Sequence, residues 1–153
     1  MLYGIVNRCL EIGAATGRYS HALARQGFRV DAVELVEHNI EIFKQNTIPG
    51  ETVSIIQGNA TDLFMFADDT YDITLLLGPM YHLFTTEDKL KALSEAIRVT
   101  KKNGVVFAAY CMGDASVLSY GFIRGEIYNI IEKCMLNTET FDTFSHPWDI
   151  FEL

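Results

Sequence analysis

The chain has 153 residues, of which 49% are hydrophobic and 21% are charged, and its formal net charge at pH 7 is −8. This length and composition predict one globular domain, and the acidic balance argues against a nucleic-acid substrate because no cluster of Lys and Arg offsets it. No apolar run reaches the roughly 20 residues that a bilayer span requires, and no secretory signal is visible, so we expect a cytoplasmic protein without membrane contact.

Cysteine usage points to a reducing compartment and away from a metal site. Cys9, Cys111 and Cys134 are few, odd in number and without the spacing of metal ligands. We therefore expect reduced, mostly buried thiols and no bound metal.

Short apolar runs alternate with longer amphipathic segments, which predicts a series of βαβ units. The first half of the chain should contain strands over 5–12, 30–35 and 53–56. A helix over 18–26, ended by Gly27, should bury Tyr19, Ala22 and Leu23. A second helix should bury Val36, Ile40 and Phe43.

The second half should contribute a fourth strand over 71–77 and a fifth, buried strand over 105–111, after a turn at 102–104. Thr85 and Asp88 resemble a capping box, and the helix that they open should bury Leu90, Leu93, Ala96 and Ile97. Beyond the fifth strand, 114–136 should hold helical pieces broken by Gly121 and Gly125, and no strand is predicted over 137–153.

The turn after the first strand carries the most informative motif. Glu11, Gly13 and Gly17 form the pattern acid-x-Gly-x-x-x-Gly, between a strand and a helix. Small residues there let the backbone approach a ligand, and the helix N-terminus directs free amides toward it. The dinucleotide pattern G-x-G-x-x-G fails at two of its three positions, which are Ala15 and Arg18 in this chain.

This turn resembles motif I of class I S-adenosylmethionine-dependent methyltransferases, Asp/Glu-x-Gly-x-Gly-x-Gly, with Ala15 in place of the middle glycine. Glu34, at the end of the second strand, is placed to accept both ribose hydroxyls of an adenosyl group. Residues 57–63 resemble the loop that contacts adenine in this family, and the Asn59 amide oxygen could accept from the exocyclic amine. The resemblance continues through 71–78 and 98–104, and so covers about residues 5–111.

The resemblance implies a Rossmann-like α/β fold with five parallel strands in the order 3-2-1-4-5 and without the family's usual strands 6 and 7. Residues 1–153 would form a single methyltransferase-like domain, with a cofactor-binding core over 5–111 and a partial substrate-side segment over 112–153. The implied cofactor is S-adenosylmethionine, and Glu11 would lie near its methionyl ammonium. The implied cofactor-binding residues are Glu11, Gly13, Ala14, Ala15, Gly17, Tyr19, Glu34, Leu35, Asn59, Ala60 and Leu77.

The methyl acceptor should lie beside residues 78–82, which follow the fourth strand. Tyr81 and His82 are the catalytic candidates, and His82 could act as general base toward a hydroxyl or thiol, although a packing role is as well supported. Gly78 lacks a group that would grip an amine. The implied activity is in-line methyl transfer to a small molecule. The alternatives are a donor-binding chain without activity and, more remotely, an NAD-dependent oxidoreductase; an exposed fifth-strand edge could also support a homodimer.

Overall fold

The computed structural model describes residues 8–110, 117–133 and 135–139. It divides the chain into two compact units, Met1–Ala109 and Tyr110–Leu153. Among the described residues, no helix combines the length and the apolar character needed to cross a bilayer.

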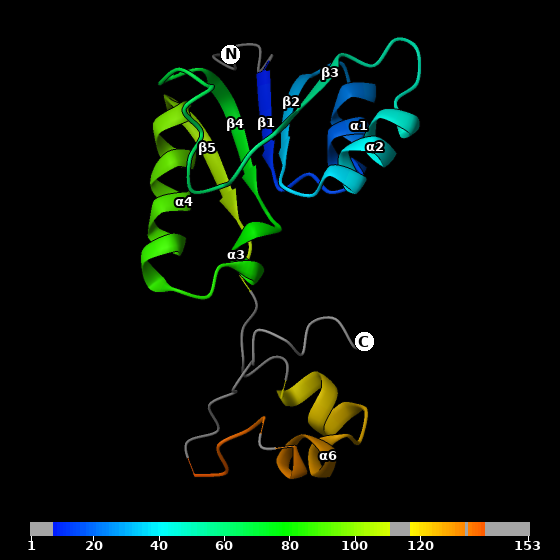
Figure 1. The fold of residues 1–153 in the computed structure, drawn as a ribbon, viewed down its shortest axis with the longest axis vertical. Coiled ribbons are helices and arrows are strands. Elements are labelled where there is room, and N and C mark those ends of the chain that lie inside the picture. The colour runs from blue at the N-terminus through cyan, green and yellow to red at the C-terminus, as the bar shows by residue number, and fades with distance from the viewer. Residues whose placement is uncertain (1–7, 111–116, 134, 140–153) are drawn as a thin grey trace, which may run out of the picture. The chain divides into compact units, whose positions relative to one another are not determined.

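One five-stranded parallel sheet forms the centre of the first unit (Figure 1). The strand order is β3-β2-β1-β4-β5, which confirms the predicted fold. β1 lies in the middle because it pairs with both β2 and β4. The strands are β1 (Arg8–Ile12), β2 (Arg29–Glu34), β3 (Val53–Gln57), β4 (Tyr71–Leu76) and β5 (Thr100–Ala108).

Helices cover both faces of this sheet, with α4 (Thr86–Val99) on one side and α1 (Arg18–Arg25) and α2 (Glu37–Asn46) on the other (Figure 1). Successive strand residues point to opposite faces, so the apolar run of β1 serves both layers. Leu10 and Ile12 belong to the cluster that contains Ala96 of α4, whereas Cys9 packs with Ala24 of α1. Cys9 is a buried free thiol, as predicted; the other two cysteines lie outside the described residues.

The predicted buried face of α1 is wrong in part. Tyr19 is 48% exposed and Ala22 is also exposed, while Ser20, His21 and Ala24 are buried. His21 can be buried because its Nδ1 lies 2.8 Å from a Glu51 carboxylate oxygen. On α2, Ile40 and Phe43 are buried as predicted, but Val36 is half exposed.

The predicted face of α4 is also wrong in part, although Ala96 is buried and Leu93 packs against the core as predicted. Leu90 and Ile97 are 61% and 57% exposed, whereas Ala92, Ala96 and Val99 are fully buried. Small side chains at positions four and three residues apart allow the helix backbone to lie close to the sheet. Hydrophobicity alone favoured Leu90 and Ile97, whereas close packing against the sheet buries the smaller Ala92, which was not predicted. The predicted N-cap is confirmed, because the Thr85 hydroxyl accepts from the Asp88 amide at 3.0 Å.

β5 begins earlier than predicted and lies at the edge of the sheet. Tyr71 pairs with Thr100, but Ile73 pairs with Val105, so the expected turn at 102–104 is an irregularity within the strand. β5 ends at Ala108 instead of residue 111. Val105 and Phe107 are about half exposed, which corrects the expectation of a buried strand and agrees with the expected apolar edge. Dimerisation through this edge stays a prediction.

The described part of the second unit contains a π-helix, η1 (Val117–Ile123), and α6 (Ile127–Glu132). Gly121 is buried within η1 and does not break it, contrary to the sequence prediction. Gly125, with a φ of 76°, lies between the two helices, as predicted for a break. Ile127 accounts for the glycine at 121, since a Cβ there would lie 3.0 Å from its side chain.

Candidate active site

The carboxyl ends of the strands meet at one edge of the sheet, and the predicted site residues follow those ends. Ile12 pairs with Val33 on one side and with Leu76 on the other, and Glu34 pairs with Gln57. In open α/β sheets, ligands bind outside this edge where the strand order reverses, which is here between β1 and β4.

The glycine turn after β1 is held in a left-handed backbone conformation. Gly13, Ala15 and Gly17 have φ values of 74°, 46° and 88°. The amides of Gly13 and Ala14 both donate to the carbonyl oxygen of Val33, at 2.8 and 3.0 Å, so the turn is fixed to β2. Gly17 then precedes the first residue of α1.

Glu34 joins three segments at this edge. Its side chain is buried, and its Oε2 accepts from the amide of Ala15 at 2.8 Å. Its Oε1 accepts from the amide of Val36 at 3.0 Å and from Nδ2 of Asn39 at 3.3 Å. Its carbonyl oxygen accepts from the amide of Gly58 at 3.0 Å. The carboxylate therefore links the glycine turn to the start of α2, and the backbone of the same residue holds the loop after β3.

The number of hydrogen bonds that the Glu34 carboxylate can still accept determines how many ribose hydroxyls it could bind. A carboxylate offers about four lone-pair positions, and three N–H donors already occupy this one. No other described residue donates to the fourth position, which is on Oε2. The geometry thus suits one sugar hydroxyl without rearrangement, whereas the sequence suggested two. Leu35, the next residue, is 61% exposed and offers apolar surface at the same edge.

Glu11 is buried beside the start of α1. Its Oε2 accepts from the amide of Ser20 at 2.8 Å and also from the Ser20 hydroxyl. Burial raises the pKa of Glu11 to about 6, although the Ser20 hydrogen bonds oppose this rise, and the nearby charge of Glu34 adds to it. A cationic ligand beside Glu11 would favour its ionised form. Tyr19, on the same turn of α1, is half exposed.

The loop after β3 is a compact turn. Asn59 forms an isolated bridge with Asp62, and its Oδ1 accepts from both the amide and the hydroxyl of Thr61, each at 3.0 Å. Both lone pairs of the amide oxygen are thus already used, so acceptance from an adenine amine would require Thr61 to move. Ala60 is 9% exposed and packs into the core.

The segment proposed for the acceptor lies against the glycine turn. It forms the short helix α3 (Pro79–His82), and a Cβ added at Gly13 would lie 2.6 Å from Cδ of Pro79. Leu77, just before it, is partly buried. Tyr81 and His82 are exposed, and neither side chain forms a hydrogen bond or ion pair with another described residue.

Three contacts at this edge were missed by sequence reasoning. They are those of Ser20 with Glu11, of Asn39 with Glu34, and of Pro79 with Gly13. The contact with Ser20 has a local signal, because the first amides of a helix lack partners within the helix and an acid shortly before it can accept from them. The other two contacts depend on tertiary placement, which spacing along the chain does not encode.

Comparison with known proteins identifies the family. The methyltransferase domain family profile matches residues 10–108, and the chain belongs to this family. This confirms the resemblance and argues against the oxidoreductase alternative. In fold, the chain matches a SAM-dependent methyltransferase from Methanosarcina mazei with a TM-score of 0.67 at 17% identity, over 93% of this chain and 72% of that one.

Two curated relatives are methyltransferases by name. The demethylmenaquinone methyltransferase of Clavibacter sepedonicus is 34% identical over 98 residues, which are 63% of this chain and 38% of that protein. The ubiquinone biosynthesis O-methyltransferase of Rickettsia prowazekii (strain Madrid E) is 25% identical over 147 residues, which are 94% of this chain and 55% of that protein. The chain therefore spans about half the length of these relatives.

Proposed function

We propose that the chain binds S-adenosylmethionine at the carboxyl edge of β1 and β2 and transfers its methyl group to a small-molecule acceptor. The observation that carries this proposal is the buried Glu34. Its carboxylate accepts from the glycine turn and from the start of α2, with one acceptor position that no described residue uses, and its carbonyl oxygen accepts from the loop after β3. Membership in the methyltransferase domain family supports the choice of cofactor.

Different residues would contact the ribose, the base and the methionyl part of the donor. Glu34 would accept from a ribose hydroxyl, and Leu35 would cover one face of the base. Glu11, whose carboxylate is buried beside the turn, would stabilise the methionyl ammonium through a charge-assisted contact. Gly13, Ala14, Ala15, Gly17 and Tyr19 would form the wall beside the methionyl part, and Asn59, Ala60 and Leu77 would line the base side and the sheet edge.

The acceptor would lie over α3. A bound sulfonium donor supplies an activated methyl group, so the protein mainly has to align the acceptor and exclude water. Tyr81 and His82 are the exposed polar side chains of α3, and His82 would take the proton from a hydroxyl or thiol acceptor. The relatives' names, which concern demethylmenaquinone and ubiquinone biosynthesis, favour quinone-type molecules in a first acceptor panel.

Isothermal titration with S-adenosylhomocysteine tests donor binding. We expect binding at one site per chain. Glu34→Gln should weaken it at least about tenfold, because the side-chain NH₂ group of Gln would face a backbone N–H donor, that of Ala15 or that of Val36, where the carboxylate now accepts. Glu41→Gln is the matched control: it removes the same charge from α2, where the side chain is 64% exposed. Absence of binding by the unaltered chain, or equal binding by Glu34→Gln, would reject the proposal.

Turnover requires a separate assay. We would incubate the chain with donor carrying a labelled methyl group and with demethylmenaquinone or small phenols, thiols and amines, and follow the label. Transfer that His82→Ala abolishes without changing donor affinity would support the catalytic assignment. Donor binding without transfer to any acceptor would favour the alternative of a binding chain without activity.

A further inference from the structure

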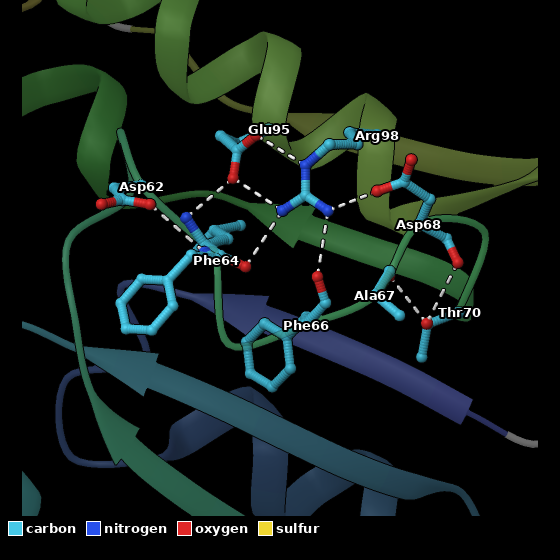
Figure 2. A network of polar contacts seen from close by, with 9 residues as sticks. Asp62, Phe64, Phe66, Ala67, Asp68, Thr70, Glu95 and Arg98 are labelled. Atoms are coloured by element: carbon cyan, nitrogen blue, oxygen red, sulfur yellow. Dashed lines mark hydrogen bonds and ion pairs between the residues drawn. The ribbon is translucent and has the colours of Figure 1, made fainter.

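The side chain of Arg98 forms an unusually complete set of hydrogen bonds near the end of α4 (Figure 2). Its Nε and Nη2 donate to the two carboxylate oxygens of Glu95, both at 2.7 Å. Its Nη2 also donates to the carbonyl of Leu63, and its Nη1 to the carbonyl of Phe66, each at 3.0 Å. The last N–H of Nη1 reaches Asp68 at 2.6 Å. All five guanidinium N–H groups are thus used.

Most surface pairs of Arg and Glu on one helix contribute little, but this pair acts on another segment. Oε2 of Glu95 accepts from the amide of Leu63 at 2.7 Å, while Arg98 holds the carbonyl of the same residue. Both backbone polar groups of Leu63 are therefore bound by side chains of α4. The Leu63 side chain is fully buried in the cluster that contains Ala92 and Ala96.

Leu63 directly follows the turn proposed for the base of the donor. The amide of Asp62 donates to the carbonyl of Asn59 at 3.0 Å, and Thr61 donates twice to the Asn59 side chain. The turn is therefore closed by its own hydrogen bonds. It is anchored to β2 where the chain enters it, through the Gly58 amide and the Glu34 carbonyl, and to α4 where the chain leaves it, through Leu63.

We propose that Arg98 and Glu95 are positioning residues for donor binding, because they fix the turn over residues 59–62 at the edge of the sheet. This inference rests on the proposed function, since it assigns the turn to the base of S-adenosylmethionine. Arg98 touches no part of the proposed donor site itself. The planar fork of Arg can hold Glu95 and two carbonyls at once, which the single ammonium of Lys cannot do.

The contacts of Arg98 and Glu95 with Leu63, here called the clamp, keep their charges near neutral pH. Hydrogen bonds from Arg98 hold the pKa of Glu95 below its ordinary value, and those to Glu95 and Asp68 raise the pKa of Arg98. Both groups thus stay ionised near neutral pH. A change in donor affinity caused by losing the clamp would therefore persist across that range.

Titration of Arg98→Lys with S-adenosylhomocysteine tests the inference on the 153-residue chain. We expect about tenfold weaker binding at a stoichiometry that stays near one per chain. A purely structural role would lower the stoichiometry through unfolded chains and leave the dissociation constant unchanged. The matched control is Arg25→Lys on α1, where Arg25 forms an ion pair with Glu51. This control makes the same change and should alter the dissociation constant less than twofold.

Double variants locate the effect. Combined with Asn59→Ala, Arg98→Lys should weaken binding by less than the product of the two single effects, because both act through one turn. Combined with Glu34→Gln, the effects should multiply. Glu95→Gln is the second variant should Arg98→Lys fail to fold. An unchanged dissociation constant in both clamp variants, with normal binding by the unaltered chain, overturns this inference alone; no binding by the unaltered chain overturns the proposed function as well.

Discussion

The backbone amide of Ala15 donates to the carboxylate of Glu34 at 2.8 Å, and Ala15 adopts a φ of 46°. A residue with a Cβ pays for this left-handed conformation, by about 1 kcal/mol for alanine. The contact with Glu34 is one interaction that holds the residue there. Ala15 stands where the methyltransferase motif usually has glycine, so the conformation required by the motif is kept without the usual residue.

Replacement of Ala15 by glycine should therefore be nearly neutral. Relief of the left-handed strain and the greater freedom of glycine in the unfolded chain are each about 1 kcal/mol and oppose one another. Ala15→Val should instead destabilise by about 2 kcal/mol, because a β-branched side chain is rare at positive φ. Urea unfolding of both variants measures the difference. Equal midpoints for the two variants would contradict the left-handed conformation at this position.

Gly13→Ala should be more harmful than a comparable change elsewhere. Its Cβ would lie 2.6 Å from Cδ of Pro79, and φ is 74°. Gly27→Ala is the control, since its φ is 91° but nothing lies within 4 Å of its Cβ. We expect a loss of about 1 kcal/mol at Gly27 from strain alone and about 2 to 3 kcal/mol at Gly13, where overpacking adds to it. Thermal unfolding of the Gly13→Ala and Gly27→Ala variants measures the difference in stability loss. Similar losses would mean that the glycine turn does not contact α3 closely.

Glu11→Gln should change the dependence of stability on pH. Burial raises the pKa of Glu11 from 4.5 to about 6, so its contribution to stability is complete below pH 4.5 and is lost as pH rises through 6. The Gln variant lacks this loss. Relative to the unaltered chain, it should gain at most about 2 kcal/mol between pH 4.5 and 7.5. Urea unfolding at those two pH values measures the gain, and a constant difference would rule out the raised pKa.

Thr85→Ala tests the start of α4. The Thr85 hydroxyl accepts from the amide of Asp88 at 3.0 Å and donates to its carboxylate at 2.6 Å. Loss of this cap should cost about 1 kcal/mol, and Thr85→Ser should recover most of it. Thermal unfolding of the two variants gives the comparison. Failure of serine to recover stability would assign the loss to the methyl group of Thr85 and not to its hydroxyl.

The sequence was sufficient for the order of the five strands and of the helices α1, α2 and α4, but not for the short helix α3. The apolar runs of a doubly covered parallel sheet are distinctive, and right-handed crossovers leave few topologies. It failed on some of the helix residues that face the sheet: Ile97 was expected there because it is large and apolar, but it is exposed, whereas Ala92 was missed and is fully buried. It also failed on β5, where the irregularity at 102–104 resembles a turn.

Prediction of the site was limited by a similar cause. The motif residues Gly13 and Glu34 have local signals, namely a glycine turn after a strand and an acid at a strand end. The groups that orient them come from distant parts of the chain. Pro79 lies against Gly13, and Arg98 acts on Leu63 across 35 positions of sequence. Such pairs are defined only once the sheet has formed, so spacing along the chain carries no record of them.

The dependence of Leu63 on α4 also bears on how the chain acquires its shape during synthesis. Every residue of the glycine turn and of the turn over 59–62 leaves the ribosome before Glu95 and Arg98 do. Until then, the backbone of Leu63 lacks both of the side chains that hold it. A nascent chain stopped before residue 95 would already contain the motif residues up to Tyr81 and His82. It would still lack the two side chains that hold the turn over 59–62 in place.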